Sequence, residues 1–555
     1  MKTTITIIGL SALLACLTLS AQETPRATAA AVAARFKQLD RNGDGKLTAD
    51  EAGQFPWFKR SDKNNDGVVT LEEVQAVFGQ PSEAATSKRS GAAGGVSDEL
   101  QKAIAYRKDS AGPVPLSDSK VFTDLQFTRD WIPGTKDRNG KLMTGTECNY
   151  IVAHGGRLYA AVSLWNHDSA APNPGPGVLV KTSAAAPWEV DVQFAPPSVR
   201  VAVLASLTFT TDAKGTALAK PVTLLVAGGS VFESRDEVAV FIRDDEAGKW
   251  TKSVIAPRAA RDIGEVRLLH VHRDRLTGVD RLIAAITNGK VYSGVFDASV
   301  PGRIRWRVEP ELADRKGRLM SIGRVNGEAY LAVDITPDAP KNGGLFRRVD
   351  GPQPRWEWLG EWGHRIQSRG VAWIRAITAI PDPEHPGKEM FLCSREVDGV
   401  IEIINTQRNH ERRVELDLRK HFGGLVGARD GQRFTTLFAY NEMTPAAHPD
   451  TGKRVLLIGG GVMPGLTGSD ARAKGAWYLV RHADGRYGTG QIFDPAFVPH
   501  AVGGLRSART ICASPFPEDK GRVFYFGGFD AAQGPHRDSA WIYRGTLPLI
   551  NKEKQ

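Results

Sequence analysis

GGLFRRVDGPQPRWEWLGEW, residues 343–362, contains the pattern that decides the fold of this 555-residue chain. An apolar strand, Gly344 to Phe346, leads into a polar turn rich in Gly and Pro, and a second strand returns carrying tryptophan. Turn residues between two runs of apolar and aromatic residues are typical of a β-hairpin. The stretch therefore predicts an antiparallel pair of strands.

The same hairpin recurs along the chain. Six further copies start at Gly177, Val238, Lys290, Gly399, Gly475 and Ser539. A second apolar segment precedes each hairpin, and in most copies a third precedes that one, as at Val201–Leu207 and Phe434–Tyr440. Four short antiparallel strands in a repeat of about 50–75 residues form the unit of a β-propeller blade. We therefore expect a mainly β fold, a seven-bladed β-propeller.

The two ends of the repeat region complement each other. The last hairpin ends the chain without a return strand, whereas residues 120–132 (KVFTDLQFTRDWI) alternate like a strand and have no blade of their own. We predict that this N-terminal strand completes the last blade and closes the ring, which removes open sheet edges. This match gives seven blades, with six and eight as the alternatives.

Two further details resemble known propellers. The Gly-Gly pairs after second strands, such as Gly228-Gly229, are similar to kelch repeats, although the Tyr and Trp spacing differs. Tryptophan after the turn resembles the Asp-box of sialidase-like propellers, and DDEAGKW (Asp244 to Trp250) departs from that pattern by one residue. The resemblance thus covers the architecture and no specific family. We expect the tryptophans to pack between neighbouring blades; they are Trp188, Trp250, Trp306, Trp356 and Trp358.

The composition is that of a globular protein, with 41% hydrophobic and 24% charged residues. The formal net charge of +10 favours an anionic partner, with a solvated basic surface as the alternative. Cys148, Cys393 and Cys512 are far apart and form no CxxC pair, so the sequence predicts buried thiols and neither a zinc site nor a redox motif.

Residues 1–21 have the features of an export signal: Lys2, an apolar run from Ile5 to Ala15, and small residues ending at Ala21. The run is too short to span a bilayer, and no later segment is a candidate for a membrane span. Cleavage after Ala21 would give a secreted or periplasmic protein. The sequence LLAC ending at Cys16 resembles a bacterial lipobox, so a lipoprotein anchored at Cys16 is the alternative.

Two twelve-residue loops follow, DRNGDGKLTADE at 40–51 and DKNNDGVVTLEE at 62–73. Both resemble the EF-hand calcium loop, with side-chain oxygens at positions 1, 3 and 5, Gly at 6 and Glu at 12. Apolar residues at helical spacing flank them, so we expect a small helical EF-hand pair over 22–80, in which Leu47 and Val69 meet through a short β-bridge. The resemblance implies calcium as cofactor and these ligands: Asp40, Asn42, Asp44, Lys46 (backbone carbonyl), Glu51, Asp62, Asn64, Asp66, Val68 (backbone carbonyl) and Glu73.

The domain organisation follows from these motifs. A Ser/Ala/Gly-rich stretch at 81–96 has the composition of a flexible linker. The propeller is expected over 97–555.

Arginines mark the expected site of the propeller. One stands at or near the start of six predicted inner strands: Arg200, Arg267, Arg318, Arg369, Arg433 and Arg506. Arg375 and Arg509 lie further along two of these strands. If the inner strands surround the axis, several guanidinium groups face one cavity, where their planar forks suit carboxylate or sulfate. In the alternative, each arginine caps a strand at the rim and pairs with a local Asp or Glu.

The candidate acid/base groups near these strands are His154, His270, His272, Tyr440 and His500, of which His270, His272 and Tyr440 are preferred. Some propeller-shaped polysaccharide lyases use arginine to neutralise a uronate carboxylate while His or Tyr removes the neighbouring proton. We found no hydrolase, metalloprotease, Walker or dinucleotide motif in a supporting context, so the sequence leaves open whether the protein is an enzyme.

We expect a calcium-binding protein outside the cytoplasm whose propeller recognises an anionic partner, and a polysaccharide is the partner we favour. One alternative is a polysaccharide lyase or glycoside hydrolase acting in the arginine-rich funnel. Another is a protein-binding scaffold. The chain carries no recognisable nucleic-acid-binding module, so nucleic acid is not expected as a partner.

Overall fold

The computed structural model describes residues 36, 40, 42, 44–48, 64, 66–73, 114–164, 177–194, 200–230, 237–256, 265–287, 289–313, 318–333, 344–361, 374–396, 399–425, 434–464, 476–494, 505–529 and 538–549. The chain divides into two compact units, 1–98 and 99–555. The predicted export signal, the Cys16 anchor and the linker at 81–96 lie outside the described residues.

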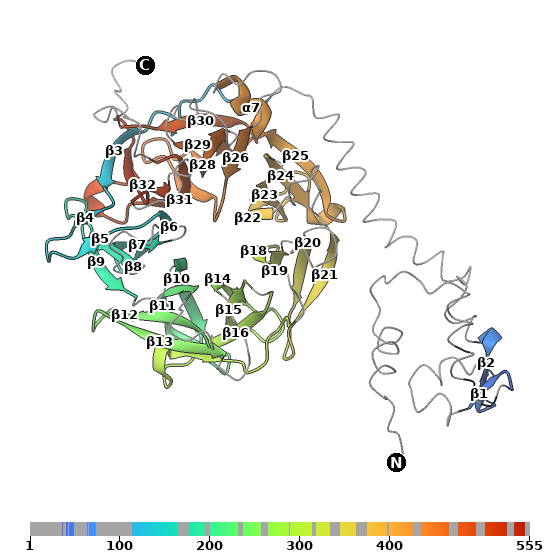
Figure 1. The fold of residues 1–555 in the computed structure, drawn as a ribbon. Helices are drawn as coiled ribbons and strands as arrows, with labels where there is room; N and C mark the ends of the chain where they lie inside the picture. The colour runs from blue at the N-terminus through green and yellow to red at the C-terminus, as the bar shows by residue number, and fades with distance from the viewer. Residues whose placement is uncertain are drawn as a thin grey trace, which may run out of the picture. The chain divides into compact units, whose positions relative to one another are not determined.

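The second unit is a seven-bladed β-propeller, as the repeats predicted (Figure 1). Blades 1 to 3 are β6–β9 (Glu147–His154, Arg157–Ser163, Gly177–Lys181, Glu189–Gln193), β10–β13 (Arg200–Thr211, Ala217–Ser230, Val238–Asp244, Lys249–Ala256) and β14–β17 (Val266–Arg273, Asp280–Ile286, Val291–Phe296, Ile304–Trp306). Blades 4 and 5 are β18–β21 (Leu319–Val325, Glu328–Val333, Gly344–Val349, Arg355–Glu361) and β22–β25 (Ile374–Pro381, Glu389–Arg395, Val400–Asn405, Glu411–Asp417). Blade 6 is β26–β30 (Phe434–Phe438, Thr444–Ala447, Arg454–Pro464, Ala476–His482, Tyr487–Ile492), and blade 7 is β31–β33 (Ser507–Ala513, Val523–Phe529, Ile542–Thr546) with β3 (Gln126–Trp131).

Strand β3 closes the ring. It pairs antiparallel with β33, from Gln126 opposite Thr546 to Trp131 opposite Ile542, and so supplies the outermost strand of blade 7. In Figure 1 the cyan strand β3 accordingly lies beside the red strands of the C-terminus. A second early segment covers the outer edge of blade 6, where the Tyr487 N–H donates to the Pro115 carbonyl at 2.7 Å. Both contacts occupy backbone groups that an open edge would expose.

The hydrophobic core is divided among the interfaces between blades. Seven clusters of buried side chains fill the seven interfaces, and one of them joins blade 7 to blade 1. Strand β7 shows why the sequence RLYAAVS is apolar throughout: Leu158, Ala160 and Val162 pack towards blade 7, whereas Tyr159 and Ala161 pack towards blade 2. Side chains alternate between the faces of a strand, so a strand buried on both sides has no polar face.

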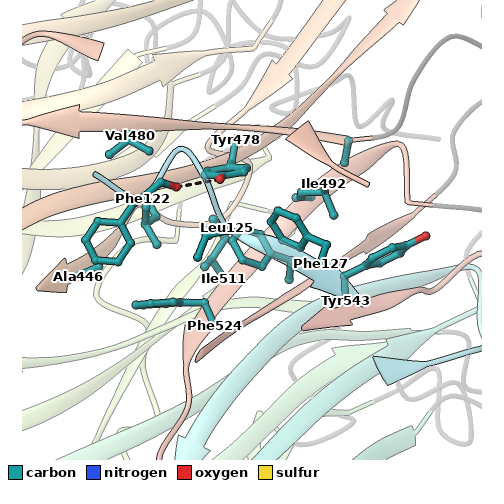
Figure 2. Close-up of a cluster of buried hydrophobic side chains, with 14 of the residues drawn as sticks. Phe122, Leu125, Phe127, Ala446, Tyr478, Val480, Ile492, Ile511, Phe524 and Tyr543 are labelled. Carbon is teal, nitrogen blue, oxygen red and sulfur yellow. Dashed lines mark hydrogen bonds between the residues drawn. The ribbon is translucent and has the colours of Figure 1, made fainter. Parts of the chain in front are cut away.

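The interface between blades 6 and 7 is the most aromatic part of the core (Figure 2). Phe127 on β3 lies edge-on to Phe526 and Tyr478, with ring centroids 5.1 and 5.8 Å apart. The Tyr478 hydroxyl donates to the Phe122 carbonyl at 2.8 Å, which anchors the segment before β3. Phe122 has φ of 64°, a left-handed conformation that costs a non-glycine residue about 1–2 kcal/mol.

The tryptophans of the hairpins pack between blades, as expected. Three of them also donate a hydrogen bond to the outermost strand of the preceding blade: Trp188 to Asp130 (2.6 Å), Trp250 to Asp191 (2.6 Å) and Trp306 to Ser253 (3.0 Å). The repeated tryptophan therefore links consecutive blades through both its ring and its N–H group.

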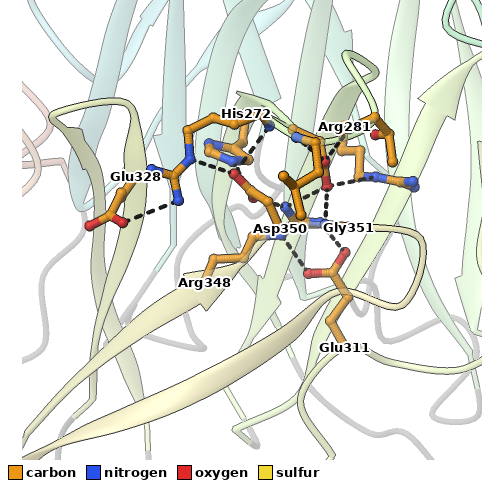
Figure 3. A network of polar contacts seen from close by, with 11 residues as sticks. His272, Arg281, Glu311, Glu328, Arg348, Asp350 and Gly351 are labelled. Atoms are coloured by element: carbon orange, nitrogen blue, oxygen red, sulfur yellow. Dashed lines mark hydrogen bonds and ion pairs between the residues drawn. The ribbon is translucent and has the colours of Figure 1, made fainter.

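Blades 3 and 4 are joined by a buried ionic network (Figure 3). The Arg348 side chain, which has no exposed surface, donates to Glu311 (2.9 Å), Asp274 (3.2 Å) and Asp350 (2.5 Å). His272 Nε2 lies 2.8 Å from Asp350 Oδ1 in the same network. The candidate acid/base residue His272 therefore belongs to an ionic network that links two blades.

The remaining elements are small. A hairpin of β4 (Thr135–Lys136) and β5 (Leu142–Met143) precedes blade 1, and helix α7 (Leu418–Leu425) follows blade 5. In the first unit, β1 (Lys46–Thr48) pairs with β2 (Val68–Thr70). Among the described residues, none of the helices has the length and apolar character needed to cross a membrane.

Candidate functional site

The innermost strand of every blade is irregular at the same level of the propeller. In six strands an extra residue interrupts the pairing with the next strand. The extra residues are Asn149 on β6, Ala202 on β10, Arg267 on β14, Met320 on β18, Ala376 or Ile377 on β22, and Arg509 on β31. In blade 6 the pairing stops at Phe438 and resumes at Thr444, so residues 439–443 take this place. A β-bulge redirects a side chain and is common beside functional sites.

Residues at or beside the bulges of blades 1 to 5, together with two residues of 439–443, line a pocket, which we call the axial pocket. Its wall consists of Asn149, Tyr150, Arg200, Ala202, Arg267, Leu268, Met320, Arg375, Tyr440 and Asn441. Its volume is about 10 Å³, enough for one water-sized group. Ala376 and Ala439, beside the pocket, have φ of 49° and 51°, conformations that only a well-determined surrounding maintains in non-glycine residues. Only the end of a ligand can be enclosed here.

Tyr440 lies among several guanidinium groups. Arg267 Nη2 donates to the Tyr440 hydroxyl at 3.0 Å. The guanidinium carbons of Arg375 and Arg509 lie 4.0 and 3.9 Å from the centroid of the Tyr440 ring, a distance at which a cation is attracted to the π face. Burial alone would raise the pKa of Tyr440, but the positive charges of Arg375, Arg509 and Arg267 outweigh burial and lower it to about 6.

Carboxylates balance part of this charge. Glu147 accepts from Arg509 at 2.6 Å and pairs with Arg200 at 2.9 Å. Glu265 lies 3.5 Å from Arg200 and 3.6 Å from Arg267, and Glu396 pairs with Arg375. Arg318 is close enough to Arg267 that their repulsion, added to burial, lowers its pKa. Five guanidinium groups therefore face three paired carboxylates in the described part of the site.

Three buried donors of this site have no hydrogen-bond acceptor among the described residues. They are Arg509 Nε, and also Arg200 Nε and Arg267 Nη1, which lie 3.5 and 3.6 Å from the Glu265 carboxylate without forming a hydrogen bond. Leaving a buried polar group without a partner costs about 1–3 kcal/mol, and more when the group is charged. An acceptor supplied by a ligand would remove that cost.

Glu442 is a second titratable group near the pocket. Its carboxylate accepts a hydrogen bond from the Thr510 hydroxyl at 3.0 Å. Burial raises its pKa to about 7, although the Thr510 hydroxyl and the Ile511 backbone N–H act in the opposite direction. At neutral pH this carboxyl group is present in both protonation states.

The predicted arginines divide into three groups. Arg200 and Arg267 line the pocket, and Arg318 is near it. Arg506 is absent from the pocket wall, and its N–H donates to the Phe529 carbonyl at 3.1 Å. Arg369 and Arg433 lie outside the described residues.

Arg375 and Arg509 were predicted only as additional arginines further along their strands. In the structure both lie about 4 Å from the ring of Tyr440. The bulges on β22 and β31, the strands of these two arginines, were not predicted either. The positive φ of Ala376 has no signature in the sequence. Of the acid/base candidates, Tyr440 lies in the pocket wall, whereas His270 and His272 do not. Burial, together with the nearby His272 and Arg324, lowers the pKa of His270 to about 4.

The calcium loops form the other candidate site. Leu47 pairs with Val69 in the bridge between β1 and β2, which confirms the expected contact, and both side chains are buried. Gly45 and Gly67 have φ of 79° and 83°, the left-handed conformation required at position 6.

Oxygen atoms are concentrated in both loops. The Asp40 carboxylate accepts from the N–H groups of Asp44 (3.1 Å) and Gly45 (2.8 Å), and Asp66 accepts from Val68 (3.0 Å). Glu51 and Asp62 lie outside the described residues. No three His, Cys, Asp or Glu side chains within the described ranges gather as a metal site.

Comparison with known proteins identifies the N-terminal motif. The family model described as EF hand matches residues 32–55 and 56–78. The N-terminal part of the chain therefore carries two EF-hand sequences. No curated protein matches the chain.

Two solved structures are among those similar to the propeller. An exo-β-1,3-galactanase from Clostridium thermocellum has 11% sequence identity and a TM-score of 0.30, over 76% of this chain and 97% of that chain. A GH43 β-1,3-galactosidase with galactodeoxynojirimycin has 10% identity and a TM-score of 0.26, over 52% of this chain and 97% of that chain. Likenesses this weak support no conclusion about substrate or activity.

Proposed function

We propose that the propeller binds the carboxylate or sulfate group of an anionic partner in the axial pocket, and that the partner is an acidic polysaccharide met outside the cytoplasm. The observation that carries this proposal is the cluster of buried arginines, in which Arg509 Nε has no hydrogen-bond acceptor among the described residues and Arg200 Nε and Arg267 Nη1 have only long contacts with Glu265. Planar guanidinium groups suit carboxylate and sulfate oxygens, and the small pocket has room for one oxygen atom of such a group. The export signal predicted at 1–21 would take the protein to a location where such polymers occur.

Binding to glycans tests this proposal. Full-length protein should bind polygalacturonate or a sulfated glycan in calorimetry at pH 6, and Arg267→Met should weaken binding by roughly 2–3 kcal/mol because one partner of a buried charged contact is lost. Arg413→Met, a change of an exposed arginine on β25, is the matched control and should bind like the wild type. Circular dichroism verifies that both variants fold. Equal affinities of the two variants, or no retention of any acidic glycan, would contradict an axial anion site.

A polysaccharide lyase is the second candidate, and the low pKa of Tyr440 favours it. A phenolate at neutral pH can take the proton from the carbon beside a uronate carboxylate while arginine stabilises the charge that develops on that carboxylate. The electron pair of the broken C–H bond forms a C=C bond, and the glycosidic oxygen on the neighbouring carbon leaves and takes up a proton. Glycoside hydrolysis is less suited to this site, since it uses a pair of carboxyl groups and three of those nearby are paired with arginine.

Turnover distinguishes these candidates. Incubation with polygalacturonate should produce ultraviolet absorbance from an unsaturated sugar if the protein is a lyase, and Tyr440→Phe should remove that signal. Retention without turnover supports a binding protein. Neither retention nor turnover would favour a scaffold for other proteins.

We further propose that residues 22–80 bind calcium. Asp40, Asn42, Asp44 and Glu51 would hold one ion with the Lys46 carbonyl, and Asp62, Asn64, Asp66 and Glu73 another with the Val68 carbonyl. The acidic and amide oxygens of the described loop residues and the left-handed glycines fit this ion. Extracellular sites of this kind are filled constitutively, so the ion would stabilise the unit and would not act as a switch.

Calcium titration of the full-length chain should release or absorb heat with a Kd of about 10⁻⁴–10⁻³ M. The double variant Asp40→Ala and Asp62→Ala should show no such heat, because each loop loses its first ligand. Asp212→Ala, in a turn of blade 2, should bind calcium like the wild type. A wild-type chain that gives no heat and gains no thermal stability from calcium would refute the assignment.

A further inference from the structure

Tyr440 occupies the part of the axial pocket where an anion would need its donors. Its hydroxyl accepts a hydrogen bond from Arg267, and its ring lies within about 4 Å of Arg375 and Arg509, as described above. Arg509 also has a buried donor, Nε, without a hydrogen-bond acceptor among the described residues, and Arg267 Nη1 has only its 3.6 Å contact with Glu265. The phenol oxygen and an external anion must therefore share the same guanidinium groups.

Charged and titratable groups face Tyr440 from six other blades or from its own segment. They are Glu147 and Tyr150 from blade 1, Arg200 from blade 2, Glu265 and Arg267 from blade 3, Arg318 from blade 4, Arg375 and Glu396 from blade 5, Glu442 from its own segment, and Arg509 from blade 7. The five arginines exceed the three carboxylates paired with them by two charges. A phenolate at Tyr440 balances one of these, so the surroundings favour the ionised phenol.

We propose that Tyr440 is the internal counter-ion of the axial pocket, so that an external anion binds there by displacing the phenolate charge and one proton is taken up with it. The balance is simple: phenolate, anion and proton become phenol and bound anion, and no covalent bond other than O–H forms. The inference rests on the proposed anion site. It makes Tyr440 a determinant of which anion binds and at what pH.

The coupling has a definite sign. When Tyr440 is ionised in the free protein with a pKa of about 6, each pH unit above 6 weakens anion binding by about tenfold, until the pKa of the bound state is reached. At pH 8 the ionised Tyr440 should therefore lower the affinity for the anion by roughly 100-fold. Tyr440→Phe removes the competing charge, so its affinity should be nearly independent of pH between 6 and 8 and should exceed the wild-type affinity at pH 8.

The first experiment needs no ligand. The ultraviolet absorbance of phenolate is recorded on full-length protein between pH 5 and pH 9. We expect one tyrosine to ionise with a midpoint near 6 in the wild type and none to do so in Tyr440→Phe. Tyr543→Phe is the control, because burial raises the pKa of Tyr543 to about 12, and it should keep the step near 6. A wild type without this step overturns the proposal.

The second experiment adds galacturonate or inorganic sulfate at pH 7. We expect the phenolate absorbance to fall on binding, and calorimetry in bis-Tris and Tris buffers to report uptake of up to one proton that Tyr440→Phe abolishes. The two probes distinguish a carboxylate from a sulfate ligand. Binding without proton uptake overturns the counter-ion role and leaves the anion site standing. A phenolate step that neither these probes nor an acidic glycan disturbs instead overturns the anion site.

Discussion

Replacing Arg348 by methionine should lower the free energy of unfolding by about 3–5 kcal/mol. The guanidinium group of Arg348 is buried between blades 3 and 4 and is paired there with Glu311, Asp274 and Asp350. Without it, the buried Glu311 loses its paired guanidinium group, while Asp274 and Asp350 retain Arg281 at 3.7 Å and the partly exposed Arg275 at 2.9 Å. Removing one partner of a buried ion pair is costly because the other partner stays buried without compensation.

The neighbouring Arg347 provides a matched control. Its side chain is 35% exposed and pairs with Glu357, which is 49% exposed. Arg347→Met should change the free energy of unfolding by less than about 1 kcal/mol, since exposed pairs contribute little. Denaturant unfolding followed by tryptophan fluorescence compares the two variants. Similar losses in both would mean that the network in Figure 3 does not join the blades as argued.

Truncating Phe127 to alanine should destabilise the propeller by about 3–5 kcal/mol. Phe127 is 4% exposed and lies on β3, the strand that completes blade 7, where its ring contacts Phe526 and Tyr478. The substitution leaves a cavity at the interface that holds the ring closed. Proteolysis of residues before blade 1 should also become faster, because β3 separates from β33 more often.

Gln126, the preceding residue, is exposed on the same strand and pairs with Thr546. Gln126→Ala keeps the backbone pairing and removes no buried surface, so its effect should stay within about 0.5 kcal/mol. Thermal and denaturant unfolding measure both changes. If Phe127→Ala proved as mild as Gln126→Ala, closure by β3 would not be a main source of stability.

The propeller could be predicted because its unit is local and repeated. Hairpins such as residues 343–362 can be recognised from their turn residues and their tryptophan. The last copy lacks a return strand, and residues 120–132 were the one predicted strand without a blade. The uniform apolar character of strands such as β7 also follows from burial on both sides. The missing return strand and the unmatched residues 120–132 were enough to predict that β3 pairs with β33.

The site could be predicted only in part. Two of the arginines predicted at strand starts, Arg200 and Arg267, line the pocket, but the pattern gave Arg375 and Arg509 no priority. After a bulge, each side chain of the strand points to the face opposite to the one that simple alternation predicts. The sequences of these strands do not show at which residue the bulge occurs. The low pKa of Tyr440 depends on three arginines that are far apart in the chain, so no local pattern contains it.

The pairing of the first propeller strand with the last has a consequence for how the molecule is made. β3 leaves the ribosome long before β33 exists, so blade 7 cannot assemble until almost the whole chain has been synthesised. Until then Phe127, which packs between blades 6 and 7, lacks Phe526, and Trp131, which packs between blades 7 and 1, lacks Tyr525. Contacts between residues so distant in sequence form slowly, and the growing chain is therefore exposed to aggregation or to chaperones for most of its synthesis.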